Sequence, residues 1–440
     1  MSALARYFLA LGFNVAGYDK TETPLTKKLI EEGVEIHFKD DLSLVDPMFK
    51  TKENTLVVIT PAIPENHSEW SYFKKGGFEI LKRAQVLGRI TETNKSIGVA
   101  GTHGKTTISS MISYLFKYCQ IPFTAFLGGI SKDLGSNYHN DFKSEITIIE
   151  ADEYDRSFLE LKPTIATISA IDPDHLDIYG TKEEMQKTFK KYLDENLQKE
   201  GVGIIHSSLK NSLGINYKTY SIEDESADYF AANFRVENAD FFADFQWIEG
   251  EIKDVKIGLP GIHNMENALL AFGVGIEEGL DPQLMKEAIG KYSGVERRFD
   301  IQIQSNQLVY IDDYAHHPEE IKKLIESVRR MYPSKNILGI FQPHLFSRTK
   351  DFADDFARSL EMLDELLLLD IYPAREKPIS GVNSKMLFDR ITMNSKMLCS
   401  KKELPSYIIA SKCTVVLTIG AGDIGAEVGN LRKLLLKTNK

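Results

Sequence analysis

The chain has 440 residues, of which 42% are hydrophobic and 26% charged, a composition typical of a globular protein with about three domains. A net charge of −10 argues against general nucleic-acid binding and against attraction to anionic membranes. Three cysteines, odd in number and far apart, indicate a reducing compartment and neither a disulfide framework nor a cysteine zinc site. Because no apolar run is long enough to span a membrane, we expect a cytoplasmic protein.

The opening residues, MSALARYFLALGF, predict an amphipathic helix with Leu4, Phe8 and Leu11 on one stripe, followed by a strand at 14–18. A helix is an unusual start for the alternating strand–helix pattern that follows. It is either a simple first helix or the end of a strand–loop–helix unit whose strand and glycine loop are missing. We favour the second interpretation and expect an incomplete first domain.

Strands and helices alternate along the chain and predict α/β domains with mostly parallel sheets. The pattern changes at 225–258, where alternating side chains predict a small antiparallel sheet, and a helix is expected at 263–279. A new strand–helix series starts near residue 295 and indicates a further α/β domain. The other expected elements are strands at 55–60, 96–100, 146–150, 165–171, 202–206, 308–312, 336–341, 365–372 and 414–420, and helices at 106–118 and 182–196.

A glycine-rich segment between a predicted strand and a predicted helix indicates a phosphate-binding loop. Its glycines let backbone N–H groups close around phosphate oxygens, and the helix N-terminus adds a positive dipole. Lys105 can reach the terminal phosphates of a nucleoside triphosphate, and the Thr106 hydroxyl can ligate Mg²⁺. The spacing departs from the strict P-loop pattern, and the alternative is a tight turn with a surface lysine. The loop comprises Gly101, Thr102, His103, Gly104, Lys105, Thr106 and Thr107.

Acidic residues follow the next two strands of the series. Glu150 ends an apolar strand, where a carboxylate points into the crevice at which α/β sheets bind ligands, and we expect it to hold the metal. Asp152 and Glu153 are explained as well by a solvated acidic turn. His175 could ligate a second Mg²⁺ or orient a water, or it could be structural, and its spacing does not decide.

The remaining histidines give no zinc signature. Six of the ten histidines lie in short Gly-, Asn-, Asp- or Pro-bearing segments, but none has the H-x-x-x-H or C-x-x-C spacing of zinc sites. Asn264 and Asn267 are expected on the first turn of a helix, where their amides could contact a base or ribose. From the sequence alone, helix capping accounts for them better.

Polar groups also follow the strands of the last domain. Arg298 stands where that domain begins and could close onto a phosphate, although most such arginines form surface ion pairs. Asp313 ends one strand, and His344 and Arg348 follow the next, where they could hold a small carboxylate. Three such segments at successive strand ends favour a ligand-binding cleft.

The segment GAGDIG at 420–425 matches the G-x-G-x-x-G pattern of dinucleotide-binding folds. Such a fold needs a second strand with an acidic residue about 20 positions further on, and only 15 residues remain. We therefore reject a nicotinamide-cofactor site here and expect a glycine turn that lines the cleft.

Eight motifs together carry a resemblance that covers nearly the whole chain. The chain is similar to the Mur ligase family, in which these motifs occur in the same order, and the opening MSALA resembles the end of that family's first glycine loop. The motifs are GTHGKTT, EADEYDRSF, DPDHLDIYG, GIHNMEN, GVERRFD, DDYAHHPEE, FQPHLFSRT and GAGDIG.

The resemblance implies a Rossmann-like domain for a UDP-sugar at 1–92, incomplete here, a P-loop ATPase domain at 93–296 and a Rossmann-like domain at 297–440. It also implies an ATP-dependent ligase that joins L-alanine to the lactyl carboxylate of UDP-N-acetylmuramate through an acyl phosphate. Close alternatives are a murein-recycling ligase that adds a tripeptide and a truncated chain that only binds nucleotide. Folate-type ligases share the central fold but match the motifs less well.

The resemblance also implies roles for single residues. Lys105 and Thr106 would contact the ATP phosphates and Mg²⁺, and Glu150 and His175 would be metal ligands. His344 and Arg348 would face L-alanine, although the family often has arginine where this chain has Leu345. His175 or His344 would accept the amine proton. The positions that would hold the nucleotide and support domain closure are Asn264, Asn267, Arg298 and Asp313.

Overall fold

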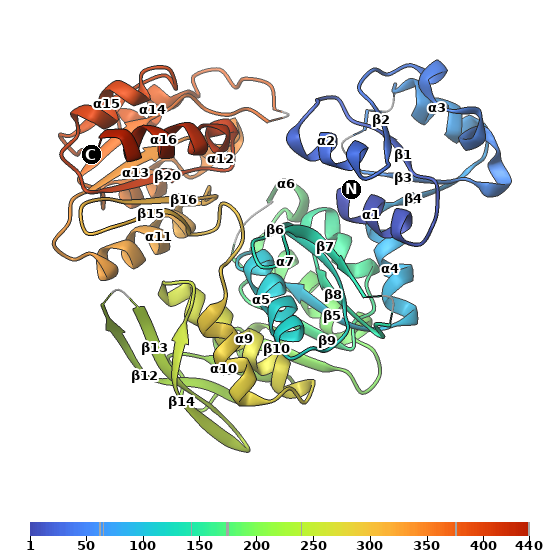
Figure 1. Ribbon diagram of the computed structural model, residues 1–440, viewed down its shortest axis with the longest axis horizontal. Helices are drawn as coiled ribbons and strands as arrows, with labels where there is room; N and C mark the ends of the chain where they lie inside the picture. The colour runs from blue at the N-terminus through green and yellow to red at the C-terminus, as the bar shows by residue number, and fades with distance from the viewer. Residues whose placement is uncertain are drawn as a thin grey trace. The chain divides into compact units, whose positions relative to one another are not determined.

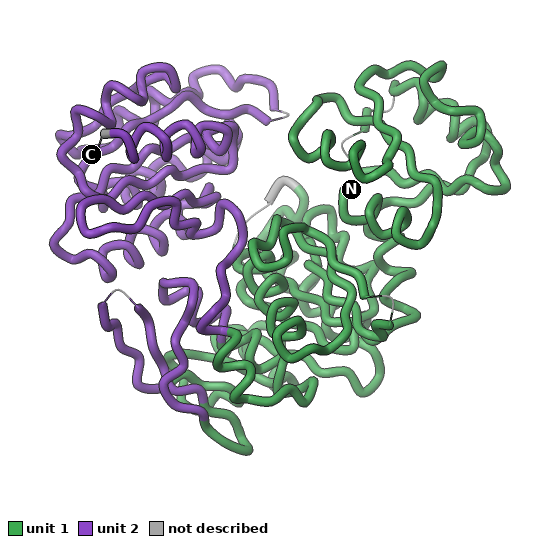
Figure 2. The backbone as a smooth tube through the Cα atoms, viewed as in Figure 1, with its two compact units in different colours: residues 1–231, 246–251, 269–288 green, residues 232–245, 252–268, 289–440 purple. Residues whose placement is uncertain are grey.

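The computed structural model (Figure 1) describes residues 1–60, 63–64, 66–141, 143–172, 176–238, 240–374 and 376–438, without the side chains of 176, 177 and 438. Its contacts divide the chain into two compact units, which Figure 2 colours separately. Unit 1 is Met1–Ala231 with Gln246–Glu251 and Leu269–Ala288, and unit 2 is Ala232–Phe245 with Ile252–Ala268 and Ile289–Lys440. The three domains at 1–92, 93–296 and 297–440 stay a prediction.

The N-terminal part of unit 1 contains two small parallel sheets. In one, β1 pairs with β2, and in the other β3 pairs with β4. The predicted first helix is confirmed as α1, which buries Leu4. The elements are α1 (Ser2–Ala10), β1 (Ala16–Tyr18), α2 (Pro24–Glu31), β2 (Glu35–His37), β3 (Leu56–Ile59), α3 (Ser68–Lys75), β4 (Glu79–Lys82) and α4 (Arg83–Thr93).

Among the described residues, ten strands form one sheet in the order β14-β13-β12-β11-β10-β9-β5-β8-β6-β7. The pairs from β11 to β6 are parallel, and β7 is antiparallel to β6. The strands from β5 to β11 are β5 (Lys95–Ala100), β6 (Thr124–Ser131), β7 (Ser136–Asn140), β8 (Ile146–Glu150), β9 (Ile165–Ile168), β10 (Val202–His206) and β11 (Lys218–Ser221).

The central strands are apolar because both faces of the sheet are covered, as parallel sheets require. Every residue of β5 after Lys95 is buried, and the helix α5 (Lys105–Tyr118), which packs on β5, β6 and β8, buries Ile108, Met111 and Leu115 completely. The strand order reverses at β5, with β8 on one side and β9 on the other. Ligands of open α/β sheets bind beyond the carboxyl ends of strands at such a reversal.

The predicted strands of 225–258 are present as β12 (Tyr229–Glu237), β13 (Asp240–Trp247) and β14 (Gly250–Ile257). Only two residues separate each from the next, which is the length of a hairpin loop between antiparallel strands. They join the large sheet, because β12 runs parallel to β11. The helices that follow β9 are α6 (Leu176–Tyr179), α7 (Lys182–Lys191), α8 (Lys210–Leu213), α9 (Ile262–Glu277) and α10 (Pro282–Lys291).

Unit 2 contains a sheet whose described strands follow the order β15-β16-β20-β17-β18-β19, all parallel except β15. The chain returns to place β20 between β16 and β17, so this sheet also has a reversal. Its strands are β15 (Asp300–Gln304), β16 (Val309–Asp313), β17 (Ile337–Phe341), β18 (Glu365–Leu368), β19 (Lys396–Leu398) and β20 (Val415–Ile419). Its helices are α11 (Pro318–Met331), α12 (Phe346–Asp351), α13 (Ala353–Leu360), α14 (Ser384–Phe388), α15 (Leu404–Ala410) and α16 (Val428–Thr438).

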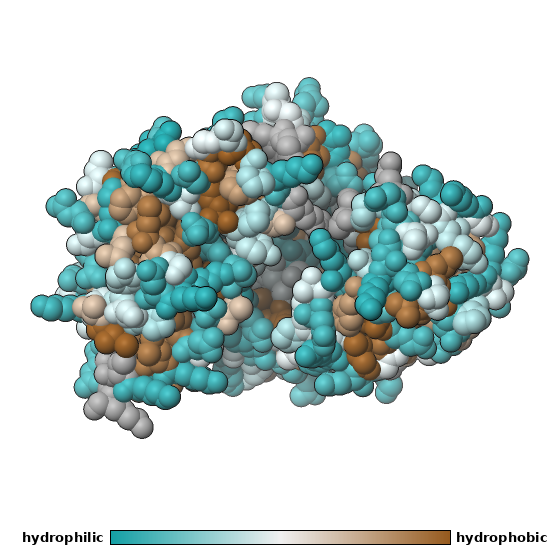
Figure 3. Space-filling model, turned by 90° about the horizontal axis from the view of Figure 1, so that it is seen from above, coloured by the Kyte–Doolittle hydropathy of each residue, from teal (hydrophilic) through white to brown (hydrophobic). Residues whose placement is uncertain are grey.

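The face shown in Figure 3 is mixed, with brown apolar patches set among teal polar side chains. Single exposed apolar residues are normal on a globular surface and need no special explanation. Within the described ranges, no helix combines the length and apolar character needed to cross a bilayer.

Candidate active site

The predicted phosphate loop lies directly after β5, and its two glycines have conformations that other residues rarely adopt. Gly101 has φ +130° and Gly104 has φ +82°. A Cβ atom on Gly101 would lie 2.1 Å from the Ser169 hydroxyl oxygen. Glycine is therefore required at Gly101 for both its conformation and its close packing on the neighbouring strand end.

Hydrogen bonds fix the loop to the residues after β9. The backbone N–H of Thr102 donates to the carbonyl of Ala170 at 2.9 Å, and the N–H of Asp172 donates to the Thr102 hydroxyl at 3.1 Å. The Asp172 carboxylate also lies 3.3 Å from Nε2 of His103. The loop is thus held in shape by the protein itself.

Lys105 lies at the start of α5 and is held by the loop and by an acidic partner. Its Nζ donates to the carbonyl of Gly101 at 2.8 Å and lies 2.8 and 2.7 Å from the two carboxylate oxygens of Glu153. Burial lowers the pKa of Lys105, but the carboxylates of Glu153, Glu150 and Asp152 outweigh it and raise the pKa overall. The lysine is therefore positively charged at neutral pH.

The interpretation of Glu153 as part of a solvated acidic turn is wrong. The residue is 1% exposed and pairs with Lys105, and its backbone carbonyl accepts a bond of 2.6 Å from the Tyr179 hydroxyl. Burial raises the pKa of Glu153, while the Lys105 ammonium opposes this effect. Only the position of Glu153, three residues after a strand end, hinted at this contact in the sequence.

Glu150 ends β8 beside the strand that carries the phosphate loop, with Val99 of β5 as its register partner. Its carboxylate accepts the N–H of Gly128 at 2.9 Å, and a Cβ atom on Gly128 would come within 2.5 Å of all three carboxyl atoms. A glycine at 128 therefore makes room for this carboxylate. The sequence analysis did not identify Gly128.

The residues present fit a magnesium ion. Three carboxylates, those of Glu150, Asp152 and Glu153, surround the single ammonium of Lys105, so the group has an excess of negative charge that a divalent cation would balance. Carboxylate and hydroxyl oxygens are the ligands that Mg²⁺ prefers, and Thr106 supplies a hydroxyl from the first turn of α5. His175, the other predicted ligand, lies outside the described residues.

Asn264 and Asn267 are buried on the first turns of α9. The Asn264 amide donates to the carbonyl of Pro260 at 2.7 Å, and the Asn267 amide donates to the Asn264 side chain at 3.2 Å. An N-cap side chain instead accepts a bond from a helix N–H. The described bonds of these two residues therefore differ from those of a capping pair.

The two adjacent arginines at the start of β15 have different surroundings. Arg297 donates to the carboxylate of Asp312 at 3.1 Å and to the carbonyl of Gly420 at 2.6 Å, which ties it to the ends of β16 and β20. Arg298, the predicted site residue, lies over the Tyr314 ring at 4.9 Å. Arg297 is an anchor within the sheet, a role that could not be predicted from the sequence.

Asp313 ends β16 and holds the turn around it. Its two oxygens accept the N–H groups of Phe299 at 2.6 Å and Ala315 at 2.7 Å. Burial raises the pKa of Asp313 to about 6, and the nearby Arg298 opposes this shift. Gly420 begins the glycine turn that was predicted to line a cleft, and it follows β20, the neighbour of β16. Its N–H donates to the Asp313 carbonyl at 3.0 Å.

The structure brings His344 and Arg348 together after β17. Nη1 of Arg348 is 3.5 Å from Nδ1 of His344, and the ring centroids of His316 and His344 are 5.8 Å apart. Burial, with Arg348 nearby, lowers the pKa of both histidines to about 4. At neutral pH this end of the sheet therefore presents uncharged imidazoles beside a buried arginine.

Sequence profiles of the Mur ligase family match three parts of the chain. They are the Mur ligase catalytic domain at 1–95, the Mur ligase middle domain at 99–275 and the glutamate ligase domain at 297–422. Among curated proteins, the UDP-N-acetylmuramate–L-alanine ligase of Parabacteroides distasonis is 47% identical over 441 residues, which is 99% of this chain and 95% of that protein. The ligase of the same name from Flavobacterium psychrophilum is 48% identical over 435 residues, again 99% and 95% of the two chains.

Solved structures of ligases are similar in fold to this chain. The UDP-N-acetylmuramate–alanine ligase of Thermotoga maritima is 25% identical and superposes with a TM-score of 0.82 over 100% of this chain and 97% of its own. A murein peptide ligase from Psychrobacter arcticus is similar in fold, with 21% identity and a TM-score of 0.69 over 100% and 96% of the two chains.

Proposed function

The chain belongs to the Mur ligase family, and we propose that it joins L-alanine to the lactyl carboxylate of UDP-N-acetylmuramate with hydrolysis of ATP to ADP and phosphate. The observation that carries this proposal is the match at nearly half identity, over almost the full length, to ligases named for these two substrates. The preformed phosphate loop with its charged Lys105 supports the use of a nucleoside triphosphate. A reaction that needs ATP and a UDP-sugar belongs in the cytoplasm.

In the first half-reaction, the γ-phosphoryl group of ATP passes to an oxygen of the lactyl carboxylate, which gives an acyl phosphate and ADP. Lys105 would contact the transferring group, and the backbone N–H groups of the loop would orient it. Mg²⁺, held by Thr106, Glu150 and His175, would neutralise charge on the phosphate oxygens. The remaining task of the protein is to align the attacking carboxylate oxygen with the leaving oxygen of ADP and to exclude water.

In the second half-reaction, the amine of L-alanine attacks the acyl carbon, the carbon–oxygen bond to phosphate breaks, and an amide forms. Arg348 has the charge and planar donors to hold the alanine carboxylate. His344 is uncharged at neutral pH and can accept a hydrogen bond from the amine, and it or His175 would take the amine proton. Leu345 replaces the arginine that many relatives carry, so Arg348 would hold the carboxylate without help from that position.

We assign Asn264, Asn267, Arg298 and Asp313 to nucleotide binding and to closure. Asn264 and Asn267 are buried and Arg298 and Asp313 are half-buried, and their contacts within unit 2 support a role in shaping a site.

Phosphate release tests the proposal when UDP-N-acetylmuramate and ATP are mixed with L-alanine, with the recycling tripeptide or with neither. We expect release that depends on L-alanine. Release only with the tripeptide would move the chain to murein recycling. Nucleotide binding with no release under any condition would leave a binding protein and contradict the ligase assignment.

A further inference from the structure

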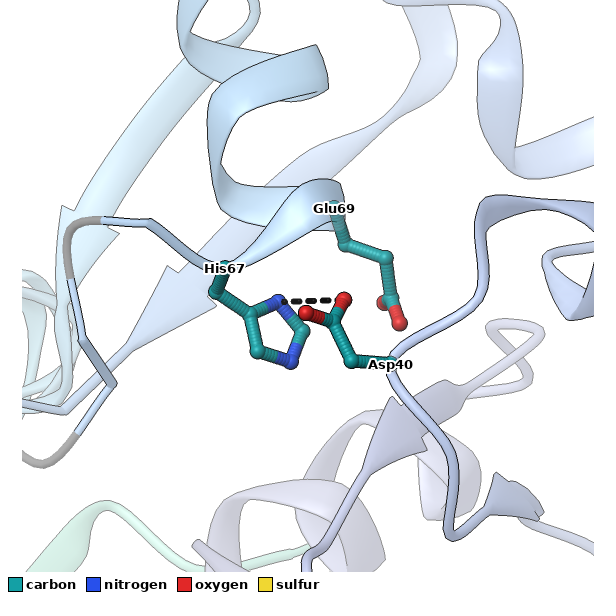
Figure 4. Close-up of side chains that lie close together, drawn as sticks. All are labelled: Asp40, His67 and Glu69. Carbon is teal, nitrogen blue, oxygen red and sulfur yellow. Dashed lines mark ion pairs between the residues drawn. The ribbon is translucent and has the colours of Figure 1, made fainter.

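A second cluster of charged and metal-binding groups lies in the N-terminal part of unit 1, separate from the phosphate loop. Asp40 follows β2, while His67 and Glu69 lie at the start of α3. One ligand atom from each lies within 4.8 Å of the others. In Figure 4 the Asp40 carboxylate points between the His67 ring and the Glu69 carboxylate. Neither the profile matches nor the phosphate-loop chemistry gives this cluster a role.

The ring of His67 is buried without a hydrogen bond. His67 is 5% exposed, and neither of its ring nitrogens has a hydrogen-bond partner. Its nearest polar contact is Nδ1 to the Asp40 carboxylate, at 3.4 Å. Buried polar groups are normally bonded, and an unbonded one costs free energy that a ligand can recover.

His37 lies beside Glu69, outside this group of three, and its tautomer is fixed. Its Nδ1 lies 2.9 Å from the carbonyl of Lys39, and because a carbonyl only accepts, Nδ1 carries the hydrogen. In the neutral ring, Nε2 therefore has a lone pair, and this atom is 3.3 Å from Oε1 of Glu69. That oxygen is itself buried without a hydrogen bond. Two acceptors facing each other need either a proton or a metal ion between them.

Two of the pair distances match the separation of neighbouring ligands on a metal. With metal–nitrogen and metal–oxygen bonds of about 2.0 Å, two ligand atoms on one tetrahedral edge are about 3.3 Å apart. The pairs His37–Glu69 and His67–Asp40 lie at 3.3 and 3.4 Å, beyond the usual 2.7–3.2 Å of a hydrogen bond. His37, His67 and Glu69 also line a pocket of about 270 Å³, which gives an ion a path of entry.

We propose a binding site for one divalent transition-metal ion of the zinc type, formed by Asp40, His67 and Glu69, with His37 beside Glu69. The imidazole ligand favours zinc over magnesium, which prefers oxygen ligands. The ion would tie the loop after β2 to the first turn of α3. Asp40 already accepts the backbone N–H of Ser68 at 3.0 Å, so the alternative is a helix-capping carboxylate beside two histidines.

Zinc retention by untagged, chelator-treated protein tests the proposal. Dialysis against zinc should be done in excess magnesium, which fills the phosphate-loop site, and bound zinc is then measured by elemental analysis. We expect about one zinc per chain, and cobalt in its place should give the visible absorption of a tetrahedral site. A wild-type chain that retains no zinc and gives no such absorption would overturn the proposal.

Two variants locate the site, and a third serves as the matched control. Asp40→Asn keeps an oxygen for the Ser68 bond, so it should fold while zinc affinity falls about tenfold or more. His67→Gln should lose zinc as well. His139→Gln, which changes another partly buried histidine of unit 1 that stacks on Phe123, should bind zinc normally.

Thermal melting separates the outcomes if His67→Gln folds poorly. Zinc should raise the melting temperature of the wild type and of His139→Gln but not that of Asp40→Asn. Equal zinc affinity and an equal melting shift in Asp40→Asn and the wild type would show that Asp40 only caps α3, which would contradict the proposal.

Discussion

Two strand ends in this molecule carry basic side chains that differ in charge: one is charged at neutral pH and the other is neutral. After β5, Lys105 is buried but remains charged because Glu153 and two further carboxylates surround it. After β17, His344 is partly buried beside Arg348 and loses its charge, with its pKa lowered to about 4. Both places lie at a reversal of strand order, which is where open α/β sheets generally bind their ligands. The architecture therefore sets where a site lies, while the sign of the neighbouring charge sets what the site can bind.

The charged site should show the largest effect of a single substitution. Lys105→Ala removes the ammonium that we assign to the transferring phosphoryl group, and we expect phosphate release to fall about 1000-fold. UDP-N-acetylmuramate should still bind, as calorimetry would measure. Lys117→Ala is the matched control, because Lys117 is on the same helix and only donates to the Asp133 carbonyl at 2.7 Å. Unchanged turnover in Lys105→Ala would contradict the assignment.

The adjacent arginines of unit 2 should separate stability from activity. Arg297→Ala leaves Asp312, which is 0% exposed, without its cation, and we expect a loss of about 3–5 kcal/mol in the free energy of unfolding. Arg298→Ala should cost less stability than Arg297→Ala and should reduce alanine-dependent phosphate release. Denaturant unfolding and initial rates on both variants test this pair. Equal destabilisation by the two would show that Arg298 is also only an anchor.

The neutral histidines should make unit 2 sensitive to acid. Burial lowers the pKa of His263, His316 and His344 to about 4, from an ordinary value of 6.5. The folded state then binds fewer protons than the unfolded state between about pH 4 and 6.5. The free energy of unfolding therefore rises with pH in this window, and the histidines make their full contribution to it above about pH 6.5. Asp313, with a pKa raised to about 6, acts in the opposite direction from about pH 4 to 6.

His263→Gln isolates one of these contributions. We expect the stability of this variant to change less between pH 4 and 6.5, by about 1 kcal/mol per pH unit at most. Urea unfolding across this range measures the slope. A slope identical to that of the wild type would mean that His263 titrates normally in the folded protein.

We expect the smallest effect from a substitution that fills the space beside the Glu150 carboxylate. A methyl group in Gly128→Ala would displace the carboxylate, and we expect the KM for ATP to rise about tenfold while the fold is kept. Gly429→Ala is the matched control, because a Cβ there meets nothing within 4 Å. Equal KM values for the two variants would show that the position of Glu150 does not matter for nucleotide binding.

Much of the fold could be predicted because hydrophobic runs and glycine loops are local signals. The strands that end at Ala100 and Glu150 and the helix after the phosphate loop lie where the sequence placed them, whereas β9 ends at Ile168, three residues before the predicted end. Strands β2, β4, β6, β7, β11, β15 and β19 were not predicted. They are edge strands, short, or interrupted by glycines, as β6 is by Gly128 and Gly129, so their apolar signal is weak.

The site residues likewise include some that could be predicted from the sequence and some that could not. Lys105 and Glu150 stand in motifs that indicate their chemistry, so the sequence could predict them as site residues. Glu153 shares a motif with Glu150, and Arg297 shares one with Arg298. Only the three-dimensional neighbours decide which of two nearby carboxylates or arginines turns inward. Asp40 and His67 come together from positions 27 residues apart with no spacing typical of a metal site, and a sequence pattern could not show this.

The contact between Lys105 and Glu153 bears on how fast the protein can turn over. An ammonium that already has a counter-ion must exchange it for phosphate oxygens, so the net attraction for a nucleotide is weaker than that of an unpaired lysine. ADP has fewer charges to offer than ATP and competes less well with the carboxylate. Glu153 would therefore help to displace the spent nucleotide, and a step that often limits such enzymes, product release, would be accelerated by a residue that takes no part in the chemistry.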